Sequence, residues 1–456
     1  MAPDSPLDFE AVLDAQPIRS FQILTIVLSG FLGLIDGFDT QVIALIAPDI
    51  AQQWHVPIAS FGLVFGIGLF GAVTGAAIFG MIGDRIGRKP VLLGAITLFG
   101  VLSLATPMAG TLGELTAFRF ATGLGLGGAL PLVVSTVAEY TPARIRSTMV
   151  SMAFCGYPLG IMTAGAVTTA LVDAFGWPVV FVAGGIVPLL LVPILAAVFP
   201  ESARILLAKN RRTAFDRLIR RLGIPGVNGR DLTVRAAAPR SPVRALFSEG
   251  RASGTLLLWA TLFLSLLLAY FLNSWVAIVA RAAGFDGRSA TLGVAALNVG
   301  GIAGSFALGR LSDRYRASAV LGAGYLIGAV AIAAIGQVDG SSALLLGTAL
   351  VAGFFSMGAQ LCTMPLCAGF YPTAERATGV GWCTSIGRIG GIVGPTVGGV
   401  LVGVGLGAPA IFAFAGAVSF AAAVAVLAMG WFVVGNPAGP PAALPVDSPL
   451  AGPGGV

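Results

Sequence analysis

Two aspartates lie in the middle of the first long apolar run of the chain, within Ile35-Asp36-Gly37-Phe38-Asp39. A carboxylate at bilayer depth costs about 2.5–3.5 kcal/mol, so an ionisable residue there indicates a function. Side chains three residues apart share one face of a helix, which predicts that both carboxylates line a watery pathway. Burial favours the neutral carboxyl group, and a nearby arginine favours the charged one. Asp36 and Asp39 are therefore predicted to bind and release a coupling proton; the alternative is a purely structural pair.

Two arginines also lie inside apolar runs. Arg388 falls about a dozen residues into the apolar segment 377–404, which at 1.5 Å per residue is roughly 18 Å deep. A guanidinium keeps its charge and matches a carboxylate with two parallel hydrogen bonds. Arg388 is predicted to hold the carboxylate of a substrate, or alternatively to pair with one of the aspartates, and the two roles could alternate in one cycle. Arg119 supplies the second positive charge, so that the four charges sum to zero. It is predicted to pair with one of the aspartates, and it is the next candidate after Arg388 to bind the substrate.

The composition is that of a membrane protein. The mean hydropathy is +0.93 and charged residues make up 10% of the chain, whereas soluble domains contain about 25%. A span needs about 20 apolar residues, and the sequence predicts an all-α membrane protein with twelve of them. The predicted spans are 21–47, 59–83, 90–108, 113–137, 147–172, 178–199, 254–280, 289–311, 317–337, 342–369, 377–404 and 408–434.

Basic residues predict the orientation of these spans. With both termini in the cytoplasm, 22 of the 26 basic residues lie on the cytoplasmic side; the exceptions are Arg281 and Arg288 outside and the two arginines within spans. The net charge of +6 thus reflects topology, and no nucleic acid is expected as a partner. The N-terminus is acidic, unlike the basic start of a signal peptide, so the first span is expected to stay in the bilayer.

The chain is expected to contain two halves. A basic linker at 200–252 separates a six-helix bundle at 21–199 from a second one at 253–434, with a cytoplasmic N-terminus at 1–20 and a disordered cytoplasmic tail at 435–456. Parallel repeats of six spans place a substrate site between the halves. The repeat is visible in paired landmarks at nearly one spacing: Gly80 to Arg85 with Gly309 to Arg314, and Pro142 and Arg146 with Pro372 and Arg376.

The linker holds recurring basic residues through 204–221. This pattern predicts a short amphipathic helix on the inner membrane surface. The alternative is a solvated linker without such a helix.

The loop after the second span reads Gly80-x-x-x-Asp84-Arg85-x-Gly87-Arg88-Lys89-x-x-Leu92, and it resembles the signature loop of the major facilitator superfamily. The patterns that begin at Arg119 and Pro200 resemble further motifs of that superfamily, and the resemblance covers about 20–434. Asp36-Gly37-Phe38-Asp39 is similar to the first-helix motif of the aromatic acid:proton symporters, which import benzoate-type and hydroxybenzoate-type acids.

The resemblance implies the major facilitator fold, with twelve transmembrane helices in two six-helix bundles, in a bacterial inner membrane. It also implies proton-coupled import of an aromatic carboxylate by alternating access. The alternative substrate is another organic acid, or a sugar or polyol. The family's functional positions fall on Asp36, Asp39, Asp84, Arg119, Glu139, Arg376 and Arg388.

A salt-bridge latch at the inner face is expected to hold the outward-open state and to break when the halves rock. The alternative is that these charges only reflect the positive-inside rule. The second-half loop lacks the Gly-Arg-Lys ending, which weakens it as a second latch. The predicted members are Asp84, Arg85, Arg88, Glu139, Arg144, Arg146, Asp313 and Arg376.

Aromatic side chains near the membrane centre could stack on a substrate ring, although most aromatics in spans only pack. The predicted ring contacts are Tyr157, Tyr270 and Trp382, and Gln360 or Asn273 could contact a ring hydroxyl.

Several features predict no catalytic chemistry. The glycine-rich run 123–128 follows no strand, so it is expected to pack helices rather than bind a nucleotide. The four cysteines are expected to be small core hydrophobes, and His55, the single histidine, is expected at the surface of an outer loop at 48–58. We therefore expect a monomeric transporter rather than an enzyme, with no metal or cofactor and with protons as the coupling ion.

Overall fold

The computed structural model describes residues 7–14, 16–142, 145, 149, 152–153, 156–222, 232–233, 243–248, 250–372 and 375–435. Within them, twelve helices are long and apolar enough to cross a membrane, which confirms the predicted all-α membrane fold. The first six are α2 (Ser20–Trp54), α3 (Phe61–Ile86), α4 (Arg88–Ala105), α5 (Leu112–Tyr140), α7 (Gly156–Phe175) and α8 (Pro178–Val198).

The second six begin after the linker. The tenth span is a composite, in which α14 (Ser342–Ala352) continues through a π-helical turn, η5 (Gly353–Met357), into α15 (Gly358–Phe370). The others are α11 (Ala252–Ala282), α12 (Gly287–Arg314), α13 (Ala317–Ile335), α16 (Arg376–Gly403) and α17 (Ala408–Gly435). Short 3-10 turns η1 (Ile58–Ser60), η2 (Thr106–Met108) and η4 (Val243–Phe247) flank the spans.

The first span is longer than predicted. Its helix runs through Pro48 to Trp54 and ends at His55, whose backbone is left-handed with φ 54°. A proline inside a membrane helix is tolerated where neighbouring helices cover the freed backbone groups. The residues after Pro48 remain apolar and packed, because Ile50 is fully buried and Ala51 is 8% exposed. The expected loop at 48–58 therefore shrinks to its last few residues, and His55 is exposed as expected.

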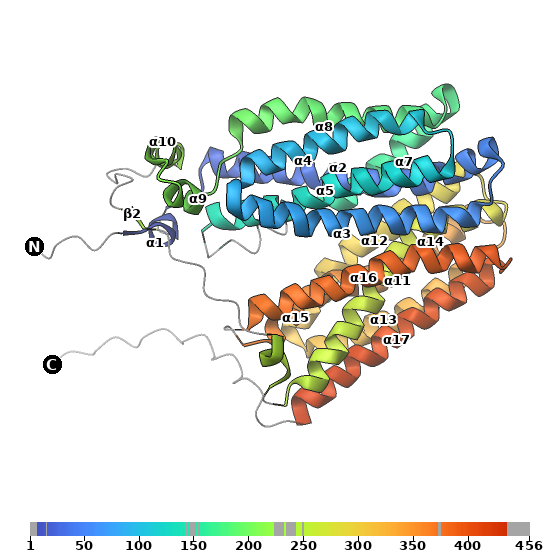
Figure 1. Cartoon of the computed structure of the whole chain (residues 1–456). Helices are drawn as coiled ribbons and strands as arrows, with labels where there is room; N and C mark the ends of the chain where they lie inside the picture. Colours follow the sequence, from blue (N-terminus) through green and yellow to red (C-terminus); the bar gives the residue numbers. More distant parts are fainter. Residues whose placement is uncertain are drawn as a thin grey trace, which may run out of the picture.

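The helices form two groups, one above the other in Figure 1. We call the end where α2 begins and α17 ends the terminal end, and the other the opposite end. The groups touch near the opposite end, where a Cβ on Gly62 of α3 would lie 2.7 Å from the Cα of Gly399 on α16. An ion pair of 3.5 Å joins Asp49 to Arg281 near the same end. Towards the terminal end, α3 and α16 diverge (Figure 1).

Glycines set the close approach of helices within the first group. A Cβ on Gly127 of α5 would lie 2.1 Å from the carbonyl oxygen of Ala72 on α3, so only glycine fits there. This contact agrees with the prediction that the glycine-rich run 123–128 packs helices. A Cβ on Gly37 would likewise meet the carbonyl oxygen of Tyr157 on α7. The glycine between the two aspartates therefore lets α2 lie directly against α7.

The linker contains the predicted amphipathic helix, but its apolar side has different neighbours from those expected. Helices α9 (Ala203–Ala208) and α10 (Arg212–Leu222) follow α8, and the apolar side of α10, with Phe215 at its centre, is buried. It packs on Phe9 and Leu13 of α1 (Phe9–Asp14) and on Tyr140. The amphipathic pattern thus packs against protein rather than against lipid. Beside it, β1 (Leu7–Asp8) and β2 (Leu232–Thr233) form a two-residue parallel pair.

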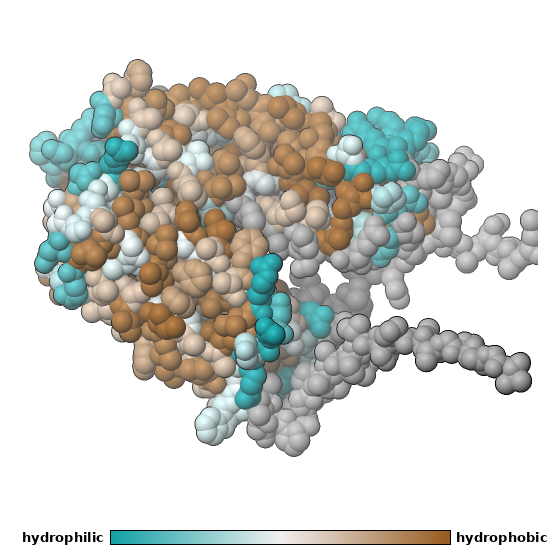
Figure 2. Space-filling view, turned by 180° about the vertical axis from the view of Figure 1, so that it is seen from behind, coloured by the Kyte–Doolittle hydropathy of each residue, from teal (hydrophilic) through white to brown (hydrophobic). Residues whose placement is uncertain are grey.

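The outer surface is apolar over the spans. Figure 2 shows a broad hydrophobic area over the helices, with hydrophilic side chains gathered towards the two ends. Exposed side chains such as Leu190, Phe306 and Val330 are 66%, 60% and 73% accessible. Such a surface is stable only against lipid, which supports a multi-pass membrane protein.

Candidate functional site

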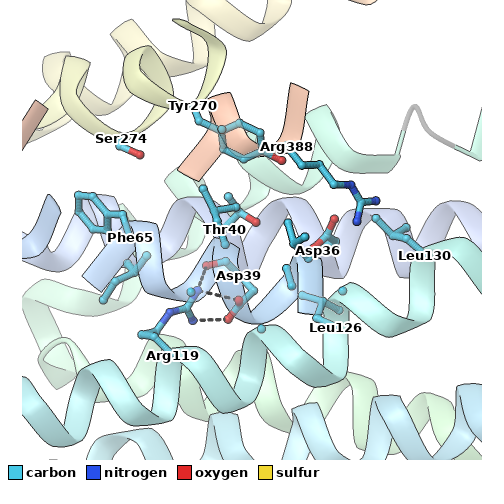
Figure 3. A pocket seen from close by; sticks show the side chains of 18 residues that line it. Asp36, Asp39, Thr40, Phe65, Arg119, Leu126, Leu130, Tyr270, Ser274 and Arg388 are labelled. Carbon is cyan, nitrogen blue, oxygen red and sulfur yellow. Dashed lines mark hydrogen bonds and ion pairs between the residues drawn. The ribbon is translucent and has the colours of Figure 1, made fainter. Parts of the chain in front are cut away.

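A cavity lies between the two groups of helices and encloses about 860 Å³ of empty space, including solvent at its open side. Helices α2, α3 and α5 line it from the first group, and α11 and α16 from the second. Both predicted aspartates, both membrane arginines and Tyr270 contribute to the lining (Figure 3).

Asp39 and Arg119 form a closed ion pair inside the first group. The guanidinium donates to both carboxylate oxygens, at 2.7 and 2.8 Å, and to the carbonyl oxygen of Asp39 at 3.2 Å. Both residues are only 5% exposed. A Cβ on Gly68 of α3 would lie 3.8 Å from the Arg119 side chain, an ordinary van der Waals distance, so α3 packs beside the arginine. Two hydrogen bonds in parallel hold the pair firmly and cancel its charges.

Asp36 and Arg388 face each other across the cavity. Figure 3 shows the guanidinium of Arg388, from α16, directed towards the carboxylate of Asp36, from α2. Both side chains are half-buried, and the described residues offer neither of them an ion pair or a hydrogen bond within contact distance. This second acid–base pair therefore joins residues of the two halves without a contact ion pair, and both of its members line the cavity.

Glycines hold the backbone around Arg388. A Cβ on Gly390 would lie 2.1 Å from the carbonyl oxygen of Phe263, and one on Gly394 would lie 2.3 Å from that of Leu267. Helix α16 therefore lies directly against α11, which fixes the base of the arginine side chain. Gly391 leaves space for the ring of Tyr270, whose nearest atom would be 2.9 Å from an added Cβ.

Two tyrosines connect the cavity to its surroundings. Tyr270 lines it directly, and Tyr157 on α7 lies close to Tyr270 and to Thr40, a cavity residue on α2. Tyr270 is thus the predicted ring contact that lines the cavity, whereas Tyr157 belongs to its surroundings.

The other predicted ring contacts lie elsewhere. Trp382 is 40% exposed, and its ring stacks on that of Trp259 with centroids 5.6 Å apart. Gln360 belongs to α15 and does not line this cavity. The amide of Asn273 is already engaged, because it donates to the carbonyl of Ala269 at 2.9 Å and accepts from Asn298 at 2.8 Å. None of these three residues lines the cavity that Arg388 faces, and their contact with a substrate stays a prediction.

Three of the residues that line the cavity were not predicted from the sequence. Thr40, Phe65 and Ser274 face the cavity (Figure 3), and the first and third are polar residues within apolar helices. A small hydroxyl residue in a span is common, so its type alone gives little signal. Only the packing of α2 against α7, and of α11 against α16, shows which hydroxyls reach the cavity.

Part of the predicted latch is assembled within the first group. Arg88, at the start of α4, pairs with Glu139 at 2.6 Å, and Ser202 donates to Glu139 at 2.8 Å. Glu201 accepts from the backbone nitrogen of Arg88 at 2.7 Å, so it caps the helix whose start is set by Gly87 with φ 125°. The sequence did not assign this capping role, which an acid placed directly after a membrane helix could have suggested.

The remaining predicted members of the latch are less connected. Asp84, Arg85, Asp313 and Arg376 are exposed at the terminal end. Arg144 and Arg146 lie outside the described residues, so the structure does not address their predicted roles. In the part of the chain that the structure covers, no three His, Cys, Asp or Glu side chains are placed to hold a metal ion.

Comparisons with known proteins agree with this architecture. The sequence profile of the Major Facilitator Superfamily matches residues 30–315 and 258–451. The chain is 38% identical to a gallate transporter of Pseudomonas putida, over 94% of this chain and 96% of the relative. It is also 38% identical to a 4-hydroxybenzoate transporter of the same species, over 88% of this chain and 90% of the relative. A crystal structure of a D-xylose-proton symporter has the same fold, with a TM-score of 0.66, 20% identity and coverage of 89% and 97%.

Proposed function

Because the chain belongs to the major facilitator superfamily, within its aromatic acid transporter family, we propose that it imports a benzoate-type or hydroxybenzoate-type acid together with protons. It is a multi-pass membrane transporter rather than an enzyme. One observation carries the proposal about the substrate: the half-buried guanidinium of Arg388 faces the cavity, and none of the carboxylates among the described residues is in contact with it. A permanent cation there attracts an anion and disfavours an uncharged sugar or polyol.

The orientation follows from the basic residues. The terminal end carries Arg85, Arg88, Lys89, Arg310 and Arg314, whereas Arg281 lies near the opposite end. By the positive-inside rule the terminal end is cytoplasmic, in a bacterial inner membrane. The halves touch at the periplasmic end and diverge at the cytoplasmic end, which corresponds to a state that releases substrate inward. Alternating access then requires the contact between Gly62 and Gly399 to separate.

The two acid–base pairs have different roles in this cycle. Asp39 and Arg119 neutralise each other within one half, so their pair can persist while the halves rock. The Asp36 and Arg388 pair must open and close, because its members belong to different halves. We assign the substrate carboxylate to Arg388 and the coupling proton to Asp36, since a carboxylate that loses its cation to the substrate is easier to protonate. Asp39 would then support coupling by holding Arg119.

The membrane potential gives an energetic reason for coupling import of the acid to protons. A monoanion that enters against an inside-negative potential is opposed by about 2.3 kcal/mol per 100 mV. One proton cancels that charge, and a second makes the potential a driving force. We propose a monomer as the transporting unit.

Uptake of labelled 4-hydroxybenzoate into proteoliposomes tests the proposal. With an inward proton gradient and no sodium, the acid should accumulate above its outside concentration, and a protonophore should reduce uptake to equilibration. Labelled xylose serves as the uncharged control and should not accumulate. Accumulation that survives the protonophore but needs sodium would contradict proton coupling.

A further inference from the structure

The two ends of the cavity differ in chemistry. Figure 3 places Arg388 on one side of the Tyr270 ring and Ser274 on the other, beside Phe65. The side with Arg388 carries the open charges that suit a carboxylate. The side with Ser274 has an apolar wall, in which Phe65 is 6% and Ile43 is 2% exposed.

The hydroxyl of Ser274 is available to a ligand. It lines the cavity and is half-buried, and none of the described residues lies within hydrogen-bonding distance of it. The neighbouring hydroxyls of Tyr270 and Thr40 both lie close to Tyr157. A free hydroxyl against an apolar wall favours a ligand that brings a polar group to that spot, because a few such groups fix orientation in a mostly apolar site.

The residues on either side of Ser274 are fixed. The carbonyl oxygen of Asn273 accepts from Gln41 of the other half at 3.0 Å. The indole of Trp275 donates to the carbonyl of Pro395 at 2.9 Å, and its ring meets that of Phe65 edge-on at 5.8 Å. A side chain whose neighbours are locked in this way can discriminate ligands, because it cannot move to accommodate a poor fit.

We infer that Ser274 is a specificity-determining residue that hydrogen-bonds a hydroxyl group on the substrate ring, at the position remote from the carboxylate. This inference rests on the proposed function, in which Arg388 holds the carboxylate. Ser274 lies one helical turn beyond Tyr270 on α11, about 6 Å along the axis. An acid whose ring lies beside Tyr270 therefore points its far edge towards Ser274. A serine hydroxyl both donates and accepts, so it fits a phenol in either direction.

The test compares two ligands that differ only in that hydroxyl. Calorimetry on the purified full chain would give the Kd of 4-hydroxybenzoate and of benzoate for the wild type, Ser274→Ala and Ser274→Thr. Loss of one neutral hydrogen bond predicts that Ser274→Ala binds 4-hydroxybenzoate roughly five- to tenfold more weakly. Benzoate should bind both proteins equally, which also shows that the variant is folded, and Ser274→Thr should restore the preference. Ser305→Ala is the control, since its hydroxyl is engaged by Ile302 at 2.7 Å on α12.

The possible results distinguish failure of the role assigned to Ser274 from failure of the proposed function. If Ser274→Ala weakens both acids alike, or neither, Ser274 does not contact the ring hydroxyl and the inference is overturned. If the wild type binds neither acid, the proposed function fails and the inference fails with it. If the wild type binds both acids and prefers 4-hydroxybenzoate, and Ser274→Ala alone loses that preference, the result supports the proposed function and the role of Ser274.

Discussion

Replacing Arg388 by lysine tests the proposed site most directly. Arg388 is half-buried and faces Asp36 without contact (Figure 3), so both of its parallel donors are free for a substrate carboxylate. Lysine keeps the charge but loses the planar fork, which removes one charge-assisted hydrogen bond. That loss is worth about 1–3 kcal/mol, or roughly a 5- to 150-fold increase in Kd. Arg388→Ala also removes the charge and should abolish measurable binding.

The assay is calorimetric binding of 4-hydroxybenzoate to the purified chain, with thermal unfolding as the measure of folding. Folding should survive both changes, because Arg388 makes no hydrogen bond or ion pair with the described residues that its removal would break. Arg288→Lys is the matched control, since Arg288 is exposed on α12. The control should leave Kd unchanged.

Arg119 is the alternative binding residue for the carboxylate. If Arg388→Lys and Arg388→Ala both bind the acid as the wild type does, the carboxylate is held elsewhere. Arg119 would then be the next candidate, although its guanidinium is already bound by both oxygens of Asp39. Unchanged affinity in the Arg388 variants, together with lost affinity in Arg119→Lys, would refute the assignment of roles to the two pairs.

Three further changes probe the rest of the site. Asp39→Asn leaves the buried Arg119 unpaired, which should lower stability by about 3–5 kcal/mol, measured by denaturant unfolding, and Asp39→Asn with Arg119→Gln should recover part of it. Asp36→Asn should still exchange labelled for unlabelled acid in proteoliposomes but should not accumulate it under a proton gradient; normal accumulation would show that Asp36 is structural. Gly399→Leu should prevent α3 and α16 from meeting at Gly62, so a cysteine reporter on the cavity wall should react faster with a periplasmic thiol reagent and slower with a cytoplasmic one. Unchanged labelling from both sides would place the closing contact elsewhere.

The sequence was sufficient to predict the spans and the charged residues of the cavity. Apolar runs of membrane length mark the helices, and charges inside such runs stand out because they are costly. Asp36, Asp39, Arg119 and Arg388 were all identified in this way, and all four line one cavity. The pairing between them could not be predicted, because it depends on how α2 and α5 are rotated about their axes. Glycine contacts such as that of Gly37 with α7 set those rotations.

The positions of neutral residues in the cavity were harder to predict from the sequence than those of charged residues. Trp382 and Tyr270 are both aromatic residues deep in spans, yet one stacks on Trp259 and the other lines the cavity. The same limit applies to hydroxyls and amides, since Asn273 and Ser274 are adjacent and differ in which of them is already hydrogen-bonded. Helix orientation decides these cases, and a hydrophobic pattern specifies it only to within a broad face.

The placement of the two acid–base pairs gives a reason for having two rather than one. A buried arginine within a single half needs a permanent counter-ion in every state, and Asp39 provides one for Arg119 at 2.7 Å. A cation that must bind and release a substrate cannot have a permanent counter-ion, because the substrate carboxylate would then have to displace it. Arg388 and Asp36 sit on different halves, so in the proposed cycle opening of the cavity would separate their charges and closure would bring them together. Loading a proton on Asp36 while the acid occupies Arg388 would keep the closed cavity neutral during the crossing, which links the two cargoes without any direct contact between them.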